Sequence, residues 1–164
     1  MEKVKIEKLI TEVSRMSRGT MIQIISEIET MMSIYIAELL TSDKQKTEEL
    51  ICLILAPRVS LEDKRQVFCF LVDQYNPEFK KEHPNHNADL KRFVEQRNIY
   101  AHYPVDFSED AIKKYKDETT FTFVQLKNSK ASLVKRIDIN ERTFHKLIDD
   151  MNVYFTALKK LIKS

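Results

Sequence analysis

The sequence contains very little glycine and proline, with one glycine and four prolines in 164 residues. Sheets and tight turns normally need more of both, because these residues supply the backbone conformations of turns. Cysteine is scarce too, and neither Cys52 nor Cys69 has the further cysteines or nearby histidines of a metal-binding set. We therefore predict a mainly helical chain with two buried, reduced thiols, as is typical of a cytosolic protein.

Long apolar runs and a strong charge bias are also missing. The most apolar stretch, residues 21–40, is interrupted by Glu27, Glu29 and Glu38, whereas a membrane-spanning helix needs about 20 mainly apolar residues. The first residues lack the apolar segment of a secretory signal. The formal charge is only +2, which is weaker than the basic bias of dedicated duplex-DNA-binding proteins. A cytoplasmic protein without a membrane partner is expected, and binding of a short nucleic-acid segment in a local cleft stays open.

Apolar residues recur at helical spacing through most of the chain. The pattern predicts helices over residues 3–17, 20–40, 47–55, 61–74, 88–102 and 141–162, with a polar loop at 76–87. Thr20, Ser60 and Asn140 are candidate N-terminal caps, and Gly19 and Pro57 are expected stops. The inward-facing positions predicted for these helices include Ile25, Ile28, Met32, Tyr35, Ile36, Leu39, Val67, Phe68, Leu71, Val72, Leu90, Phe93, Val94, Phe144, Leu147, Ile148, Met151, Phe155, Leu158 and Ile162.

Two β-branched or aromatic runs, residues 119–124 and 132–137, interrupt the helical pattern. The polar segment Lys127-Asn128-Ser129-Lys130 separates them, which indicates a two-stranded hairpin. An isolated hairpin is marginal in water, so it must pack on the helices or on a second chain. We predict one all-α domain over residues 1–164, a helical bundle with a small inserted β-hairpin at about residues 119–138.

The segment Arg97-Asn98-Ile99-Tyr100-Ala101-His102 carries the chemistry. Pro104 disfavours helix at the residue before it, so His102 is expected at a helix end. Arg97 lies on the apolar face of that helix, and its length lets it converge with His102 although the two are about 140° apart around the axis. Because a buried charge needs a partner, we predict that Glu29, on the apolar face of another helix, pairs with or orients Arg97.

These side chains suit cleavage of RNA without a metal or other cofactor. An imidazole can give or take a proton near neutral pH, which fits His102 for acid–base work. A permanent guanidinium such as that of Arg97 can bind a phosphate and stabilise charge developing on it. Asn98 could orient the histidine or donate to a phosphate oxygen. The alternative is a structural role, in which Arg97 forms an ion pair and His102 merely ends a helix.

The run Arg97-Asn98-x-x-x-His102 resembles the Arg-x4–6-His motif of the HEPN superfamily. The resemblance implies a HEPN-like helical bundle that dimerises, so that two motifs face each other across an RNA-cleaving cleft. It further implies transition-state stabilisation by Arg97, acid–base work by His102 and supporting roles for Asn98 and Tyr103. The implied setting is a toxin–antitoxin or phage-defence ribonuclease, with an antitoxin or regulatory protein as a further partner.

The resemblance has a departure and an alternative. In HEPN toxins paired with a nucleotidyltransferase antitoxin, a tyrosine often stands two residues after the histidine, where this chain has Pro104. The sequence is also similar to mannitol-operon repressor-like proteins of the same superfamily. That similarity implies the competing function, a non-catalytic HEPN-like dimer that serves as an interaction or regulatory module.

Other candidate sites are interpreted as structural. The cluster His83-Pro84-Asn85-His86 with Asp89 has no matching distant ligand, and a solvated loop is the favoured interpretation. The basic runs at residues 113–116 and 135–136 could guide an RNA backbone, although solvated faces are the commoner outcome. One glycine excludes a glycine-rich phosphate loop.

Overall fold

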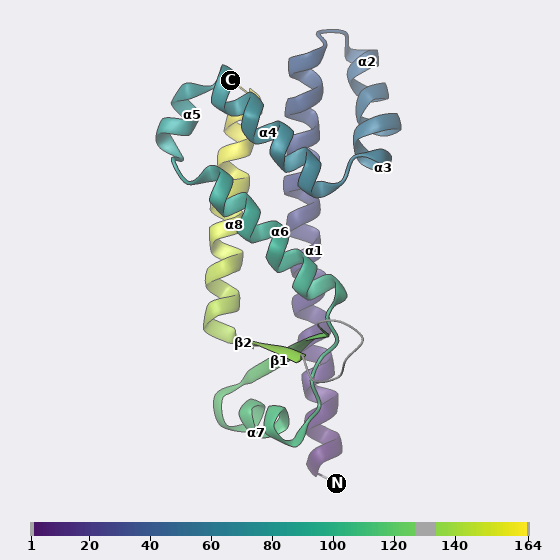
Figure 1. Ribbon diagram of the computed structural model, residues 1–164, viewed down its shortest axis with the longest axis vertical. Coiled ribbons are helices and arrows are strands. Elements are labelled where there is room, and N and C mark those ends of the chain that lie inside the picture. Colours follow the sequence, from purple (N-terminus) through teal and green to yellow (C-terminus); the bar gives the residue numbers. More distant parts are fainter. Residues whose placement is uncertain (1, 127–133, 164) are drawn as a thin grey trace. The chain divides into compact units, whose positions relative to one another are not determined.

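The computed structural model describes residues 2–126 and 134–163, which are mostly helical (Figure 1). Within them lie seven helical stretches, with α2, η1 and α3 taken as one, and an antiparallel hairpin before the last helix. This confirms the predicted class. The elements are α1 (Glu2–Leu40), α2 (Lys44–Glu49), the π-helical η1 (Leu50–Leu55), α3 (Ala56–Arg58), α4 (Leu61–Tyr75), α5 (Pro77–Glu82), α6 (His86–His102), α7 (Glu109–Glu118), β1 (Thr120–Leu126), β2 (Val134–Asn140) and α8 (Glu141–Lys163).

The chain forms two compact units. Unit 1 consists of residues 1–23 and 96–150, and unit 2 of residues 24–95 and 151–164. Helices α1, α6 and α8 each contribute one part to each unit. That residues 1–164 form a single domain stays a prediction.

Helix α1 is continuous through Gly19, so the predicted break between residues 17 and 20 is wrong. Gly19 is exposed and has no positive φ. A helical glycine costs only about 1 kcal/mol relative to alanine, which neighbouring packing can outweigh. Buried positions recur at helical spacing across this glycine, and two of them are serines that hide the pattern from an apolar count. The buried positions are Ile10, Ser14, Ser17, Met21, Ile25, Ile28 and Met32.

In unit 2, the predicted helix at residues 47–55 is longer than expected and includes a π-helical turn. Asp43 caps it, accepting a hydrogen bond from the Lys46 N–H at 3.1 Å. Pro57 does not stop it, because the chain remains helical to Arg58. The next helix, α4, matches its prediction. Its cap, Ser60, accepts from the Asp63 N–H at 3.1 Å.

The predicted polar loop at residues 76–87 contains the helix α5. Pro77 occupies its first turn, where the missing N–H costs nothing. Phe79 is buried and packs edge-on against Tyr154 of α8, with ring centroids 6.5 Å apart. The single aromatic anchor among polar residues was too weak a pattern to reveal this helix.

In unit 1, the helix α7 was not predicted. Ser108 caps it, two acidic residues follow in its first turn, and Thr119 ends it with a left-handed φ of 51°. Its buried face is short, with Ala111, Ile112 and Tyr115, and it packs on β1. The signal was therefore a capping pattern rather than a long apolar stripe.

The hairpin pairs β1 with β2 in antiparallel register, from Thr120 opposite Asn140 to Leu126 opposite Val134. Strand β2 extends to Asn140, further toward α8 than predicted, and β1 extends to Leu126 instead of ending at residue 124. The predicted turn at residues 127–130, with Ser132 and Leu133, lies outside the described residues. Phe121 and Phe123 are buried, which confirms that the hairpin packs against other parts of the chain.

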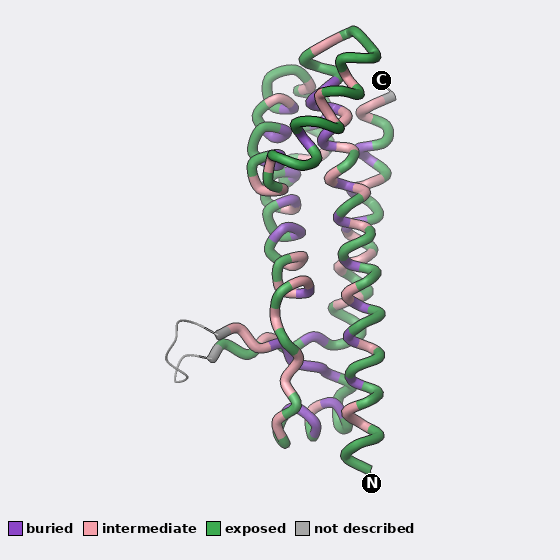
Figure 2. The backbone as a smooth tube through the Cα atoms, turned by 90° about the vertical axis from the view of Figure 1, so that its right-hand side faces the viewer, coloured by how far each residue is buried: buried purple, intermediate pink, exposed green. Residues whose placement is uncertain are grey.

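Buried and exposed positions alternate along the helices as expected for amphipathic elements (Figure 2). Most predicted core positions in α1, α4 and α6 are buried, whereas Leu39 and Val67 are exposed. On α8, Met151 and Leu158 are buried, and Tyr154 and Ala157 join them where Phe155 was expected. Its predicted cap is confirmed, since Asn140 Oδ1 accepts from the Thr143 N–H at 2.8 Å.

The two thiols differ in environment. Cys69 is buried, and burial raises the pKa of its thiol to about 11. Cys52 is exposed on η1, so its predicted burial is wrong.

Across residues 2–126 and 134–163, no helix combines the length and the apolarity that crossing a membrane requires.

Candidate functional site

The predicted catalytic side chains meet at the C-terminal end of α6, in unit 1. Arg97 Nη1 lies 3.3 Å from Asn98 Oδ1 and 3.3 Å from His102 Nε2. Arg97 is half-buried, whereas Asn98 and His102 are exposed. The guanidinium therefore bridges the angular gap around the helix, as predicted, and all three groups are accessible from solvent.

The contact between Arg97 and His102 favours one role for the imidazole nitrogen. A guanidinium can only donate hydrogen bonds, so Nε2 of His102 must accept. The tautomer that can make this hydrogen bond carries its proton on Nδ1. An imidazole nitrogen that can accept a proton thus lies directly beside a permanent cation, which is the pairing that a general base next to a phosphate-binding group requires.

Pro104 and Arg18 together form the end of α6. A residue at position 104 with an N–H would bond to the Tyr100 carbonyl, but proline has no such donor. Arg18 of α1 supplies it, with Nη1 donating to the Tyr100 carbonyl at 2.7 Å. Its Nη2 donates to the Tyr103 carbonyl at 2.5 Å. The same guanidinium therefore binds backbone on both sides of His102.

Arg18 is held in an aromatic environment. Its guanidinium carbon lies 4.8 Å from the ring centroid of Phe123 on β1. Partial burial lowers the pKa of Arg18 from its usual value. Tyr100 packs edge-on against Phe123 with ring centroids 5.2 Å apart, and Phe144 of α8 lies 5.8 Å away. Tyr100 is fully buried, which raises the pKa of its phenol.

The segment after His102 is fixed to the hairpin. The Val124 N–H donates to the Pro104 carbonyl at 2.9 Å, and the Asp106 N–H donates to the Thr122 carbonyl at 2.8 Å. Val105 forms an isolated antiparallel bridge with Phe123. The backbone of residues 104–106 therefore pairs with β1 like the edge of a further strand.

Glu29 was predicted to pair with Arg97, and the structure gives it a different cation as partner. The carboxylate of Glu29 accepts a hydrogen bond from the buried ammonium of Lys64 on α4, in unit 2. Among the residues that the structure describes, no carboxylate pairs with Arg97. Sequence periodicity could place Glu29 on an inward face, but it could not tell which buried cation would face it. Tyr103 takes part through its backbone carbonyl, which Arg18 binds.

The histidine-rich segment is more ordered than a solvated loop. His86 begins α6, is buried, and places Nε2 3.1 Å from Asp73 Oδ1. His83 packs on Phe79 with ring centroids 4.7 Å apart. In the described part of the chain, no three His, Cys, Asp or Glu side chains come together as a group that could hold a metal ion.

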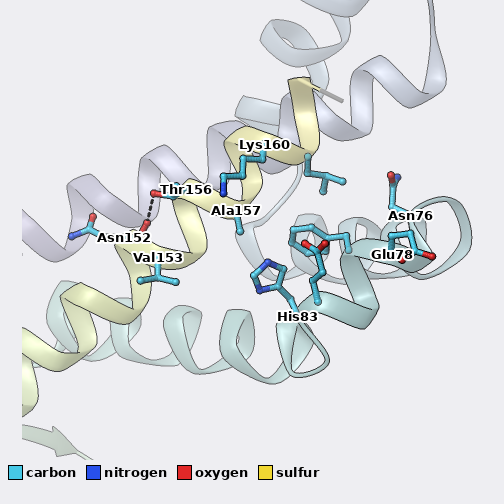
Figure 3. A pocket seen from close by; sticks show the side chains of 11 residues that line it. Asn76, Glu78, His83, Asn152, Val153, Thr156, Ala157 and Lys160 are labelled. Atoms are coloured by element: carbon cyan, nitrogen blue, oxygen red, sulfur yellow. Dashed lines mark hydrogen bonds between the residues drawn. The ribbon is translucent and has the colours of Figure 1, made fainter.

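His83 also lines a groove of about 640 Å³ between α5 and α8, in unit 2 (Figure 3). Its imidazole points toward α8, where Val153 and Ala157 form an apolar strip. Glu78 and Lys160 give the rim charges of both signs. The groove contains none of the predicted catalytic residues and has no arginine in its lining.

The basic run at residues 113–116 is largely engaged in ion pairs. Lys114 pairs with Asp138, and Lys116 pairs with Glu2 at 2.8 Å. Tyr115 is buried. In β2, Arg136 pairs with Asp106 at 2.8 Å. These contacts match the expectation of charged residues on a solvated face.

The sequence did not reveal that Arg18 and Phe123 belong to the candidate site. Arg18 directly precedes Gly19, where a helix was predicted to end. A basic residue is common in the last turn of a helix, so Arg18 did not stand out. One signal could have been used, because Pro104 leaves the Tyr100 carbonyl without a helical donor and thus predicts that a donor comes from elsewhere.

Comparisons of the chain with protein-family models, with curated proteins and with solved structures find no significant match. The candidate site is therefore defined by its own geometry and by the short motif at residues 97–102.

Proposed function

We propose that the protein is a HEPN-type, metal-independent endoribonuclease that acts in the cytoplasm on single-stranded or looped RNA. The observation that carries the proposal is the contact between Arg97 Nη1 and His102 Nε2 at an exposed helix end. The two side chains are a proton-accepting imidazole and a guanidinium that, among the described residues, has no carboxylate partner. The resemblance of residues 97–102 to the Arg-x4–6-His motif supports the same function.

The chemistry follows from these groups. Arg97 binds the scissile phosphate, and His102 Nε2 accepts the proton of the adjacent ribose 2′-hydroxyl. The 2′-oxygen forms a bond to phosphorus while the bond to the 5′-oxygen breaks, giving a 2′,3′-cyclic phosphate and a 5′-hydroxyl end. The leaving 5′-oxygen takes a proton from solvent, to which His102 later returns its own. Arg97 and Asn98 stabilise the charge that develops on the non-bridging oxygens.

Flexible RNA is the preferred substrate, because the 2′-oxygen must line up with the breaking bond. A-form duplexes hold the backbone away from this in-line geometry, whereas loops and single strands can adopt it. A homodimer would bring two such motifs to one cleft, as the resemblance implies. The proposed setting is a toxin–antitoxin or phage-defence system, with an antitoxin or regulatory protein as partner.

The second candidate is a non-catalytic dimeric interaction or regulatory module. It is favoured by exposed apolar side chains on α4, where Val67 and Phe70 lie about one turn apart and are 43% and 62% exposed. Exposed apolar patches of this kind mark protein-binding surfaces. In this case Arg97 and His102 would serve the helix end alone.

The test is cleavage of a generic single-stranded RNA in EDTA, with analysis of the product ends. The wild-type protein should produce 2′,3′-cyclic phosphate ends, and His102→Ala should lose this activity while its circular dichroism spectrum and melting temperature are retained. His145→Ala is the matched control, because His145 is an exposed histidine of α8 outside the site. Equal inactivity of folded wild-type and His102→Ala protein would favour the interaction module.

A further inference from the structure

The C-terminal end of α6 is occupied by a permanent cation. The last carbonyls of a helix carry partial negative charge and attract cations. Arg18 fills this position, and within the described residues no carboxylate pairs with it. Its charge is balanced by the Tyr100 and Tyr103 carbonyls and by the face of Phe123. The cation at this helix end is therefore Arg18.

The two hydrogen bonds of Arg18 also hold the backbone on both sides of His102. They hold the carbonyl two residues before His102 and the carbonyl one residue after it. Both are charge-assisted and short, so they restrain the 100–101 and 103–104 peptide planes, which lie one peptide group away from His102 on each side. Because Pro104 has removed the ordinary helical donor, no other backbone N–H of α6 can replace the bond to Tyr100.

We propose that Arg18 is a positioning residue that aims His102 Nε2 at Arg97. The proposal rests on the ribonuclease function for its kinetic consequences, but its structural claim concerns the imidazole alone. Arg97 and Arg18 then divide two tasks. Arg97 remains accessible to a phosphate, whereas both terminal nitrogens of Arg18 are engaged with backbone carbonyls and its face packs on Phe123.

The same contacts give the hairpin a role. Phe123 supports the guanidinium of Arg18, and its neighbours Thr122 and Val124 bond the backbone of residues 104–106. The strand β1 thus holds both the positioning residue and the chain that leaves His102. The hairpin accordingly helps to hold the backbone around His102.

The experiment compares full-length wild-type protein with Arg18→Gln, Arg18→Lys and the control Arg15→Gln. Arg15 is an exposed arginine one turn earlier on α1, so its substitution removes the same charge without touching α6. The ¹⁵N signals of the His102 ring are recorded at alkaline pH, where imidazoles are neutral, and are assigned with His102→Ala. Cleavage of single-stranded RNA in EDTA gives kcat and KM for each variant.

The wild-type and Arg15→Gln proteins should show the tautomer with its proton on Nδ1. Arg18→Gln should shift His102 to a mixture of tautomers and lower kcat about 10- to 100-fold, with KM nearly unchanged, since misplacing a catalytic group impairs the chemical step. Arg18→Lys should restore part of the loss, because an ammonium keeps the charge but reaches one carbonyl at a time. If Arg18→Gln does not fold, Arg18→Lys decides by the same readouts.

Unchanged His102 signals in a folded Arg18 variant would overturn the proposal, as would an equal loss of kcat in Arg15→Gln. An inactive wild-type protein whose His102 tautomer still depends on Arg18 would refute the ribonuclease but support the positioning role. An active wild-type protein whose kcat and His102 tautomer do not change in the Arg18 variants would support the ribonuclease but refute the positioning role.

Discussion

Removing Glu29 from its ion pair with Lys64 should cost more stability than removing Lys64. The Lys64 side chain is 2% exposed, whereas that of Glu29 is 30% exposed. Removing the carboxylate leaves an ammonium buried without a counter-charge, and such losses cost about 3–5 kcal/mol of unfolding free energy. Because water reaches the Glu29 end of the pair, we expect the lower limit for Glu29→Gln, about 3 kcal/mol.

The opposite substitution, Lys64→Met, should cost far less. Methionine fills the space of the lysine stem, and the remaining carboxylate can be hydrated through its exposed edge. We expect a loss of about 1 kcal/mol, and the double variant Glu29→Gln/Lys64→Met should be close to Lys64→Met alone.

Urea unfolding followed by circular dichroism at 222 nm measures this asymmetry. With a slope of about 2 kcal/mol per molar urea, a difference of about 2 kcal/mol separates the two midpoints by about 1 M. Coincident midpoints, or a lower midpoint for Lys64→Met, would refute the reasoning that burial of the ammonium sets the cost.

Two further substitutions test local features. Gly19→Ala should raise the free energy of unfolding in urea by about 1 kcal/mol. Gly19 is exposed and helical, and an added Cβ would meet nothing within 4 Å. A loss of stability would show that the glycine is needed at this point of α1. Hydrogen bonds from Arg65 and Gln66 lower the pKa of Glu62 from 4.5 to about 2. Its contribution to stability is therefore present above pH 4.5 and is lost as the pH falls toward 2, so Glu62→Gln should flatten the acid limb of the melting temperature between these values, and an unchanged limb would contradict the assignment.

Local sequence signals predicted much of the fold. Ser60 and Asn140 act as caps where expected, and α4, α6 and α8 end or begin within a few residues of their predicted bounds. One error came where packing outweighed a local preference. Gly19 lies inside α1 because the buried face continues through Ser14 and Ser17, which no count of apolar residues detects.

For the candidate site, the sequence predicted the components on one helix but not those from other elements. Helical spacing and arginine's reach were enough to predict that Arg97 and His102 converge. Neither the Lys64 partner of Glu29 nor the bonds from Arg18 to the end of α6 could be predicted, because both join positions far apart in the chain. Such pairings depend on tertiary packing, which periodicity does not encode.

The central claim is that the exposed His102 beside Arg97 cleaves RNA. Its most direct test is the end-group analysis of single-stranded RNA incubated in EDTA with wild-type protein, His102→Ala and the control His145→Ala. The account predicts 2′,3′-cyclic phosphate ends from the wild-type and control proteins and none from His102→Ala. Cleavage that persists in folded His102→Ala protein, or its absence from all three, would contradict the account.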